Sequence, residues 1–143
     1  MPILQHVYRL LPLLIAAALG APAFAGDQTW HCMMPDEVAN HQVKANNLVI
    51  GEIKIVQQMG QLSDIPVIQA SFVIQNTSPK DFHVAMEIVG LNDNGPVFAV
   101  SVAPSFGGTV SPHSNQPATE VVFASAGELA RANRICVRFT GDF

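Results

Sequence analysis

Residues 67–75, with the sequence VIQASFVIQ, decide the fold of this 143-residue chain. Apolar and polar side chains alternate along the stretch, with Ile68, Ala70, Phe72 and Ile74 on one face and Gln69, Ser71 and Gln75 on the other. A period of two is typical of a β-strand that buries one face. The stretch therefore predicts a strand in a sheet that packs one face on a core.

The same alternation recurs along the chain on both sides of this stretch. Further strands are expected at 48–59, 82–91, 97–103, 109–111, 119–124 and 134–139, with a short one through Trp30. Residues 36–43 are compatible with either a helical turn or a loop. Ser125 and Glu128 have the spacing of a helix capping box, which predicts a brief helix or helical turn over 126–132.

Turn-forming residues separate the expected strands. In Asn92-Asp93-Asn94-Gly95, Asn and Gly accept the positive φ that a tight turn requires. Short strands with turns every 8–12 residues are typical of sandwiches. The chain is therefore predicted to be all-β, an antiparallel immunoglobulin-like β-sandwich of about seven to eight strands with one short helical turn near the C-terminus.

The first 25 residues have the three parts of a cleavable signal peptide. A short polar lead ends at Arg9, residues 10–19 are almost all Leu, Ile and Ala, and Ala23-Phe24-Ala25 supplies small residues for cleavage before Gly26. The alternative is a membrane anchor, but the apolar stretch is about half of the roughly 20 residues that span a bilayer. We expect residues 26–143 to form one domain in the periplasm or outside the cell.

Composition limits the partners of the expected mature chain. It carries eleven acidic and six basic side chains, a formal charge of −5, and shows no cluster of Lys or Arg. Nucleic-acid binding needs such a cluster to neutralise phosphates, so this class of partner is not expected. After cleavage no apolar run is long enough to cross a membrane.

The two cysteines, Cys32 and Cys136, both lie in the expected mature chain. An even pair in an oxidising compartment predicts a disulfide, with free thiols or metal ligands as the alternatives. A loop of this length is expected to add roughly 4–5 kcal/mol of stability in the chain-entropy treatment. Cys136 shares a strand face with Arg134 and Arg138, so we expect the bond near the surface.

Four motifs occur in order between residues 68 and 123: Ile74-Gln75-Asn76-Thr77, Val84-Ala85-Met86-Glu87-Ile88, Leu91-Asn92-Asp93-Asn94-Gly95 and Val110-Ser111-Pro112-His113-Ser114. This part of the chain resembles the FxLYD-type domains of bacterial secreted proteins. Asn92 stands where that family has Tyr, and His113 where it has Gly. The resemblance implies an immunoglobulin-like sandwich that acts as a binding or accessory module and carries no catalytic residues.

A metal site is the first chemical alternative. His31, Met33 and Met34 lie together, with His41 further on, and imidazole and thioether groups suit copper. The other interpretation is that the methionines pack at the sandwich end beside the disulfide and that His31 is exposed. No spacing matches a dense copper motif, so we predict no metal and no other cofactor, and keep a small copper-handling protein as the alternative function.

The remaining candidates are structural. Ser105 precedes glycines but lacks the Gly-x-Ser-x-Gly pattern of a nucleophile elbow. His83 is expected on an outward strand face and His113 in a turn. The run 92–95 is too short for an EF-hand calcium loop. A hairpin turn accounts for it.

The sequence therefore predicts a protein that is not an enzyme. The expected function is an exported binding or accessory module of the bacterial envelope whose partner is a protein or an envelope component. The candidate binding loop is Ser105, Phe106, Gly107 and Gly108, because glycines give an adaptable loop around an exposed aromatic ring. Trp30, the single tryptophan, is expected in the core beside the disulfide; the alternative is an interface residue. A carrier of lipid-like ligands stays open.

Overall fold

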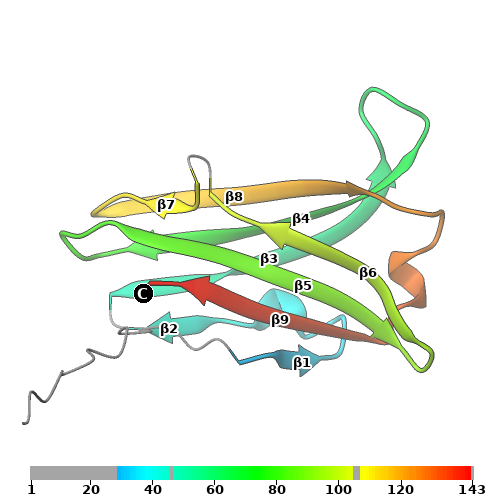
Figure 1. Ribbon diagram of the computed structural model, residues 1–143, viewed down its shortest axis with the longest axis horizontal. Coiled ribbons are helices and arrows are strands. Elements are labelled where there is room, and N and C mark those ends of the chain that lie inside the picture. Colours follow the sequence, from blue (N-terminus) through cyan, green and yellow to red (C-terminus); the bar gives the residue numbers. More distant parts are fainter. Residues whose placement is uncertain (1–28, 46, 105–106, 143) are drawn as a thin grey trace, which may run out of the picture.

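The computed structural model describes residues 29–45, 47–104 and 107–142, which fold into two antiparallel sheets (Figure 1). The first sheet has the order β1-β9-β5-β6, with β7 pairing with the start of β5. Its strands are β1 (His31–Met33), β5 (Phe82–Asn92), β6 (Gly95–Val102), β7 (Thr109–Val110) and β9 (Arg134–Gly141). The second sheet has the order β2-β3-β4-β8 and contains β2 (Val43–Ala45), β3 (Leu48–Met59), β4 (Pro66–Asn76) and β8 (Ser114–Phe123). The predicted β-sandwich is confirmed.

The core lies between the sheets and is built from the alternate positions that the sequence marks as apolar. The long strands of both sheets contribute buried rows, and each of the following side chains is at most 1% exposed: Ile68, Ala70, Phe72 and Ile74 from β4, Val84, Met86 and Ile88 from β5, and Ile135, Val137 and Phe139 from β9. The Phe72 and Phe139 rings meet edge to face across the core, 5.9 Å apart. Burial of this apolar surface drives the two sheets together.

Two single 3-10 turns connect the sheets. η1 (Val38–Asn40) lies between β1 and β2, and buries Val38. η2 (Leu129–Arg131) lies within the expected helical segment, and the Glu128 carboxylate accepts a hydrogen bond from the Ser125 amide as the capping-box spacing predicts. Gln57 of β3 ties η2 down, because its side chain donates to the Ser125 carbonyl and accepts from the Leu129 amide.

The eighth strand is longer than the sequence analysis expects. The alternation predicts a strand at 119–124, whereas β8 already begins at Ser114 and includes Pro117. The amide of Ala124 donates to the Pro66 carbonyl on the β4 side. Amides alternate in direction along a strand, so the position of Pro117 is one whose amide would face away from β4. Proline is compatible with such a position on an edge strand.

Most strands have the neighbours that they would have in an immunoglobulin domain, but the strands follow one another in a different order along the chain. Such domains pair their strands as G-F-C-C′ and B-E-D. If β8 is taken as strand B, then β9 and β1 are C and C′, and β3 to β6 are D to G, which matches the order β1-β9-β5-β6 of the first sheet and the order β3-β4-β8 within the second. β2, beside β3, has no counterpart in that scheme. β7, in the position of strand A, departs by pairing with β5 rather than with β8. The strands equivalent to C and C′ are thus the last and the first of the described chain.

Asn76 holds the turn between β4 and β5 and anchors it to β7. Its side chain is 1% exposed. The side-chain Nδ2 donates to the carbonyls of Lys80 and Ser111 at 2.8 and 3.0 Å, and Oδ1 accepts from the Ser78 amide at 2.9 Å. Asn76 thus satisfies polar backbone groups of two segments, the turn at 78–80 and the segment that follows β7, which gives the Asn-x-Ser motif a structural role.

Replacing Asn76 with alanine should destabilise the fold. The substitution leaves the carbonyls of Lys80 and Ser111 without this donor, and we expect a loss of about 2–3 kcal/mol. Urea unfolding of Asn76→Ala measures the loss, with the exposed Asn115→Ala of β8 as the matched control. An Asn76→Ala variant as stable as the control would contradict the anchoring role.

Candidate functional site

The hairpin between β3 and β4 extends past the end of the sandwich and stands clear of both sheets at the upper right of Figure 1. Met59 pairs with Pro66 at its base, and the Gly60 amide donates to the Ile65 carbonyl at 2.9 Å. This bond closes the loop below Leu62. The projection is therefore an ordered continuation of two core strands.

Exposed apolar side chains gather at this end of the molecule. Leu62 at the tip is fully exposed and Phe123, at the end of β8, is 79% exposed. The set that we call the hairpin surface is Val56, Met59, Leu62, Ile65, Val121 and Phe123, each at least 45% exposed.

Strand register brings four of these residues to one end of the second sheet. Val56 and Val121 both pair with Gln69, one from each side, and Phe123 pairs with Val67. Met59 lies further along the same hairpin. Large contiguous apolar patches on soluble proteins mark interaction sites. Six of the eight large hydrophobic side chains exposed in the described residues belong to the hairpin surface, which makes it the first candidate for binding.

An apolar cleft of about 250 Å³ adjoins the hairpin surface through Val56. It lies between η1 and the edge of β3, where β2 no longer pairs because its register covers only Leu48 to Ile50. Its walls are Pro35, Val38, Ala39, Ile53, Lys54, Ile55, Val56, Leu129 and Ile135. The hairpin surface thus continues into a concave apolar site.

The loop that the sequence marks as the binding loop is placed only in part. Ser105 and Phe106 lie outside the described residues. Gly107 and Gly108 have φ values of 74° and 84°, and the Gly108 carbonyl accepts a hydrogen bond from the Val84 amide at 2.9 Å. Both glycines therefore have a backbone role in joining β7 to β5, and a binding role for the loop stays a prediction.

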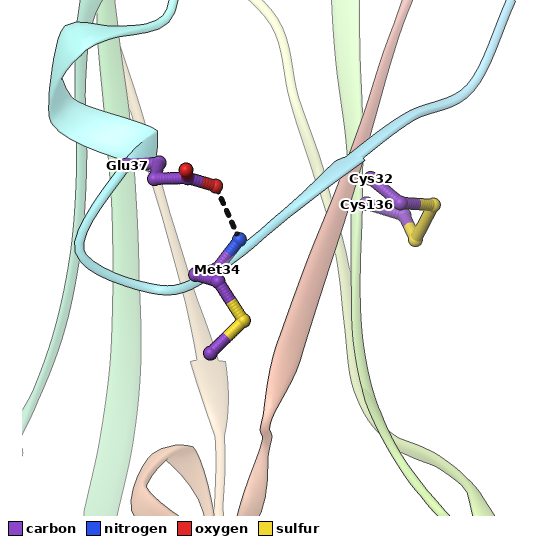
Figure 2. Close-up of a disulfide and its surroundings, with 4 residues drawn as sticks. All are labelled: Cys32, Met34, Glu37 and Cys136. Carbon is purple, nitrogen blue, oxygen red and sulfur yellow. Dashed lines mark hydrogen bonds between the residues drawn. A yellow bond between two sulfur atoms is a disulfide. The ribbon is translucent and has the colours of Figure 1, made fainter.

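The predicted disulfide is present between Cys32 and Cys136 (Figure 2). It joins directly paired residues of the neighbouring strands β1 and β9, whose Cα atoms are 4.0 Å apart. Cys32 is exposed and Cys136 is 4% exposed. Beside the bond, the Met34 amide donates to Glu37 Oε2 at 2.8 Å, which fixes the turn into η1 (Figure 2).

Trp30 lies outside the core, contrary to the expectation from sequence. It is 39% exposed, and the Arg138 guanidinium stands 4.6 Å from its ring centre. Arg138 also forms an ion pair with Glu87 on β5. Alternation explains the correction, because Trp30 and Cys32 share the outward parity of β1, while Met33 packs against the core.

His31 and His41 come together at the opening between the edge strands β1 and β2. Their ring centres are 5.4 Å apart, and both line a shallow hollow with Met33. Partial burial and the neighbouring His31 both lower the pKa of His41. Met34, the other expected ligand, is 55% exposed. Within residues 29–45, 47–104 and 107–142, no three His, Cys, Asp or Glu side chains are placed to hold a metal together.

The other histidines lie as expected. His83 is exposed, and its backbone amide and ring face the Asp142 carboxylate, with 3.2 Å between Nδ1 and Oδ2. Slight burial acts to raise the pKa of Asp142, but the His83 hydrogen bonds outweigh it and lower the pKa. His113 is exposed in a turn with φ of 48°, a left-handed conformation that glycine adopts without strain.

The run 92–95 forms the turn between β5 and β6. Asn92 Oδ1 accepts from the Asn94 amide at 2.9 Å, and Gly95 has φ of 119°. Asp93 accepts from the Asn133 side chain at 3.0 Å, which ties the turn to the start of β9. The predicted tight turn is confirmed, and its polar groups are used within the fold.

Sequence reasoning missed the hairpin surface. It treats 60–66 as a simple connection, although Leu62 and Ile65 are large apolar residues within a polar turn segment. This contrast between apolar residues and a polar turn was the signal that could have indicated an exposed apolar surface. Phe123 was harder to place, since an apolar strand residue is normally taken as core.

Comparison with known proteins finds no match for this chain among protein-family models, curated proteins or solved structures. Among the described residues, no helix has the length and apolar character needed to cross a membrane.

The disulfide should contribute strongly to stability. The double variant Cys32→Ala/Cys136→Ala opens a 104-residue separation, and we expect it to lose up to about 4–5 kcal/mol. Chemical denaturation measures the loss, and reductant should shift the wild type alone. Equal denaturation midpoints for the wild type and the double variant would refute this role.

Acid should weaken the fold through His41. Because the folded protein lowers the pKa of His41, it binds this proton less readily than the unfolded chain does. The resulting contribution to stability is present above the pKa that His41 has in the unfolded chain. It is lost as the pH falls through the pKa that His41 has in the folded protein. Urea midpoints between about pH 7 and pH 5 should fall less in His41→Asn than in the wild type. Exposed His113→Asn is the control, and parallel slopes for all three proteins would exclude the effect.

Proposed function

We propose that this protein is an exported, non-enzymatic β-sandwich module that binds another protein of the bacterial envelope through the hairpin surface. The single observation that carries the proposal is the cluster of exposed apolar side chains around Leu62 and Phe123. Water contact with such a patch is unfavourable, so a partner that covers it gains the free energy of apolar burial.

The shape of the patch supports a protein partner. A convex hairpin beside the end of β8 offers a tip, Leu62, and a flat flank, Val121 and Phe123. Interfaces commonly have such an apolar centre with a polar rim. Gln58 and Gln69, hydrogen-bonded to each other at 2.8 Å, provide polar groups beside it.

Export and family resemblance support the same proposal. The signal peptide is predicted over residues outside the described part, so periplasmic or extracellular localisation rests on sequence. The FxLYD resemblance also points to a binding module. Its motifs fit the observed turn at Asn76 and the left-handed backbone at His113.

Binding is tested with the double variant Leu62→Ser/Phe123→Ser. Both side chains are largely exposed, so the free energy of unfolding of the variant should stay within about 0.5 kcal/mol of the wild-type value. Proteins captured from envelope extract by the wild type are identified, purified and titrated directly. We expect the affinity for the cognate partner to fall at least about tenfold, as loss of a central apolar anchor does.

The matched control is Trp30→Ser/Met34→Ser, which removes two exposed apolar side chains away from the hairpin surface. This control should bind the partner as the wild type does. A partner that loses affinity equally for both double variants would show that general surface hydrophobicity governs capture. A partner held with unchanged affinity by Leu62→Ser/Phe123→Ser would refute the assigned surface.

A further inference from the structure

We propose that His31 and His41 form a low-coordinate site for a monovalent copper ion at the open edge of the sandwich, with Met33 as the third ligand. The site does not involve the hairpin surface, and the proposed function does not require it. The observation that carries it is the convergence of two imidazoles from different sheets, one on β1 and one just before β2, with ring centres 5.4 Å apart.

The separation of the rings fits a bridging ion. With a nitrogen–metal bond near 2.0 Å, each ring centre would lie about 3.2 Å from the metal. A distance of 5.4 Å between the ring centres then corresponds to an angle of about 120° at the metal. That angle belongs to three-coordinate geometry, which leaves one position for a further ligand.

His41 has a nitrogen that the fold leaves unsatisfied. Its Nε2 is shielded from solvent and has no hydrogen-bond partner among the residues that the structure describes. A shielded nitrogen without a partner is unfavourable by about 1–3 kcal/mol. A metal ion would satisfy it.

The ligand set selects the metal. Among the described residues no third His, Cys, Asp or Glu joins the pair, whereas structural zinc is almost always held by four ligands. Met33 shares the parity of His31 on β1 and lines the same hollow. Thioether sulfur with imidazole suits monovalent copper, a soft ion. Cys32, in its disulfide, has no thiolate to offer.

The test is a titration of residues 26–143 with monovalent copper under ascorbate, against a chromogenic copper chelator. A thiol assay confirms that the disulfide stays closed. Trp30 is the single tryptophan and lines the same hollow, so its fluorescence reports occupancy. We expect one ion per chain, with quenching that reaches its limit at equal concentrations.

The variants His31→Asn and His41→Asn should each weaken copper binding at least about tenfold, the lower end for disturbance of a metal site. Met33→Leu should weaken it while Met34→Leu should not. His83→Asn and His113→Asn control for adventitious histidine binding. If His41→Asn alters folding, the result for His31→Asn decides the test, because His31 lies on the edge strand β1.

The site is refuted if copper binds no more tightly than about 1 µM, or if His31→Asn binds as the wild type does. Tighter binding of Zn²⁺ than of monovalent copper would overturn the low-coordinate assignment. Unchanged affinity in Met33→Leu would overturn the third ligand.

Discussion

The covalent bond between Cys32 and Cys136 holds together the first and the last strand of the described chain. β1 pairs with β9 over only three residues, and a strand this short has little stability of its own. In an immunoglobulin domain the equivalent strands C and C′ are consecutive in the chain. Here the disulfide provides the covalent link between them.

The positions of the residues in and next to β1 depend on this disulfide. Trp30, immediately before β1, stacks on Arg138, and Arg138 pairs with Glu87 on β5. The inward parity of β1 sets His31 beside His41 across the opening between the sheets. The same three-residue strand therefore organises a polar outer face and the proposed copper site.

The hairpin surface has a different origin, in the unequal lengths of the strands. β3 and β4 have twelve and eleven residues, whereas in the facing sheet only β5, with eleven residues, is as long as β4, and β6 and β9 have eight each. The longer hairpin extends past the sheet that would cover it. Met59 has the parity of the core residue Ile53 but is 55% exposed. Apolar alternation thus continues beyond the end of the core.

Alternation made most of the fold predictable from sequence. Burial of one face requires apolar residues at every second position, so strands such as 67–75 carry an unambiguous pattern. The start of β8 at Ser114 was not predictable, because the effect of Pro117 depends on which side of β8 faces a neighbour and sequence does not reveal an edge strand. Trp30 misled the analysis because a large aromatic residue beside a disulfide can lie on either face.

The candidate sites were less predictable, since they arise from the ends of strands and from the approach of distant segments. Sequence placed His31 and His41 in one set of candidate ligands but could not show that both face one hollow. Sequence does not show which strand ends meet at one end of the sandwich, so it could not place Leu62 near Phe123. The relation between Leu62 and Phe123 requires the register of β4 with β3 and β8.

The central claim is that the hairpin surface is covered by a partner protein in the cell. It is tested most directly by in vivo photo-cross-linking, with a photoreactive amino acid placed at Leu62 and, in a parallel strain, at the exposed Ser101 on β6. The account predicts a discrete cross-linked protein adduct from position 62 and none from position 101. Equal labelling at both positions, or no adduct at position 62, would contradict it.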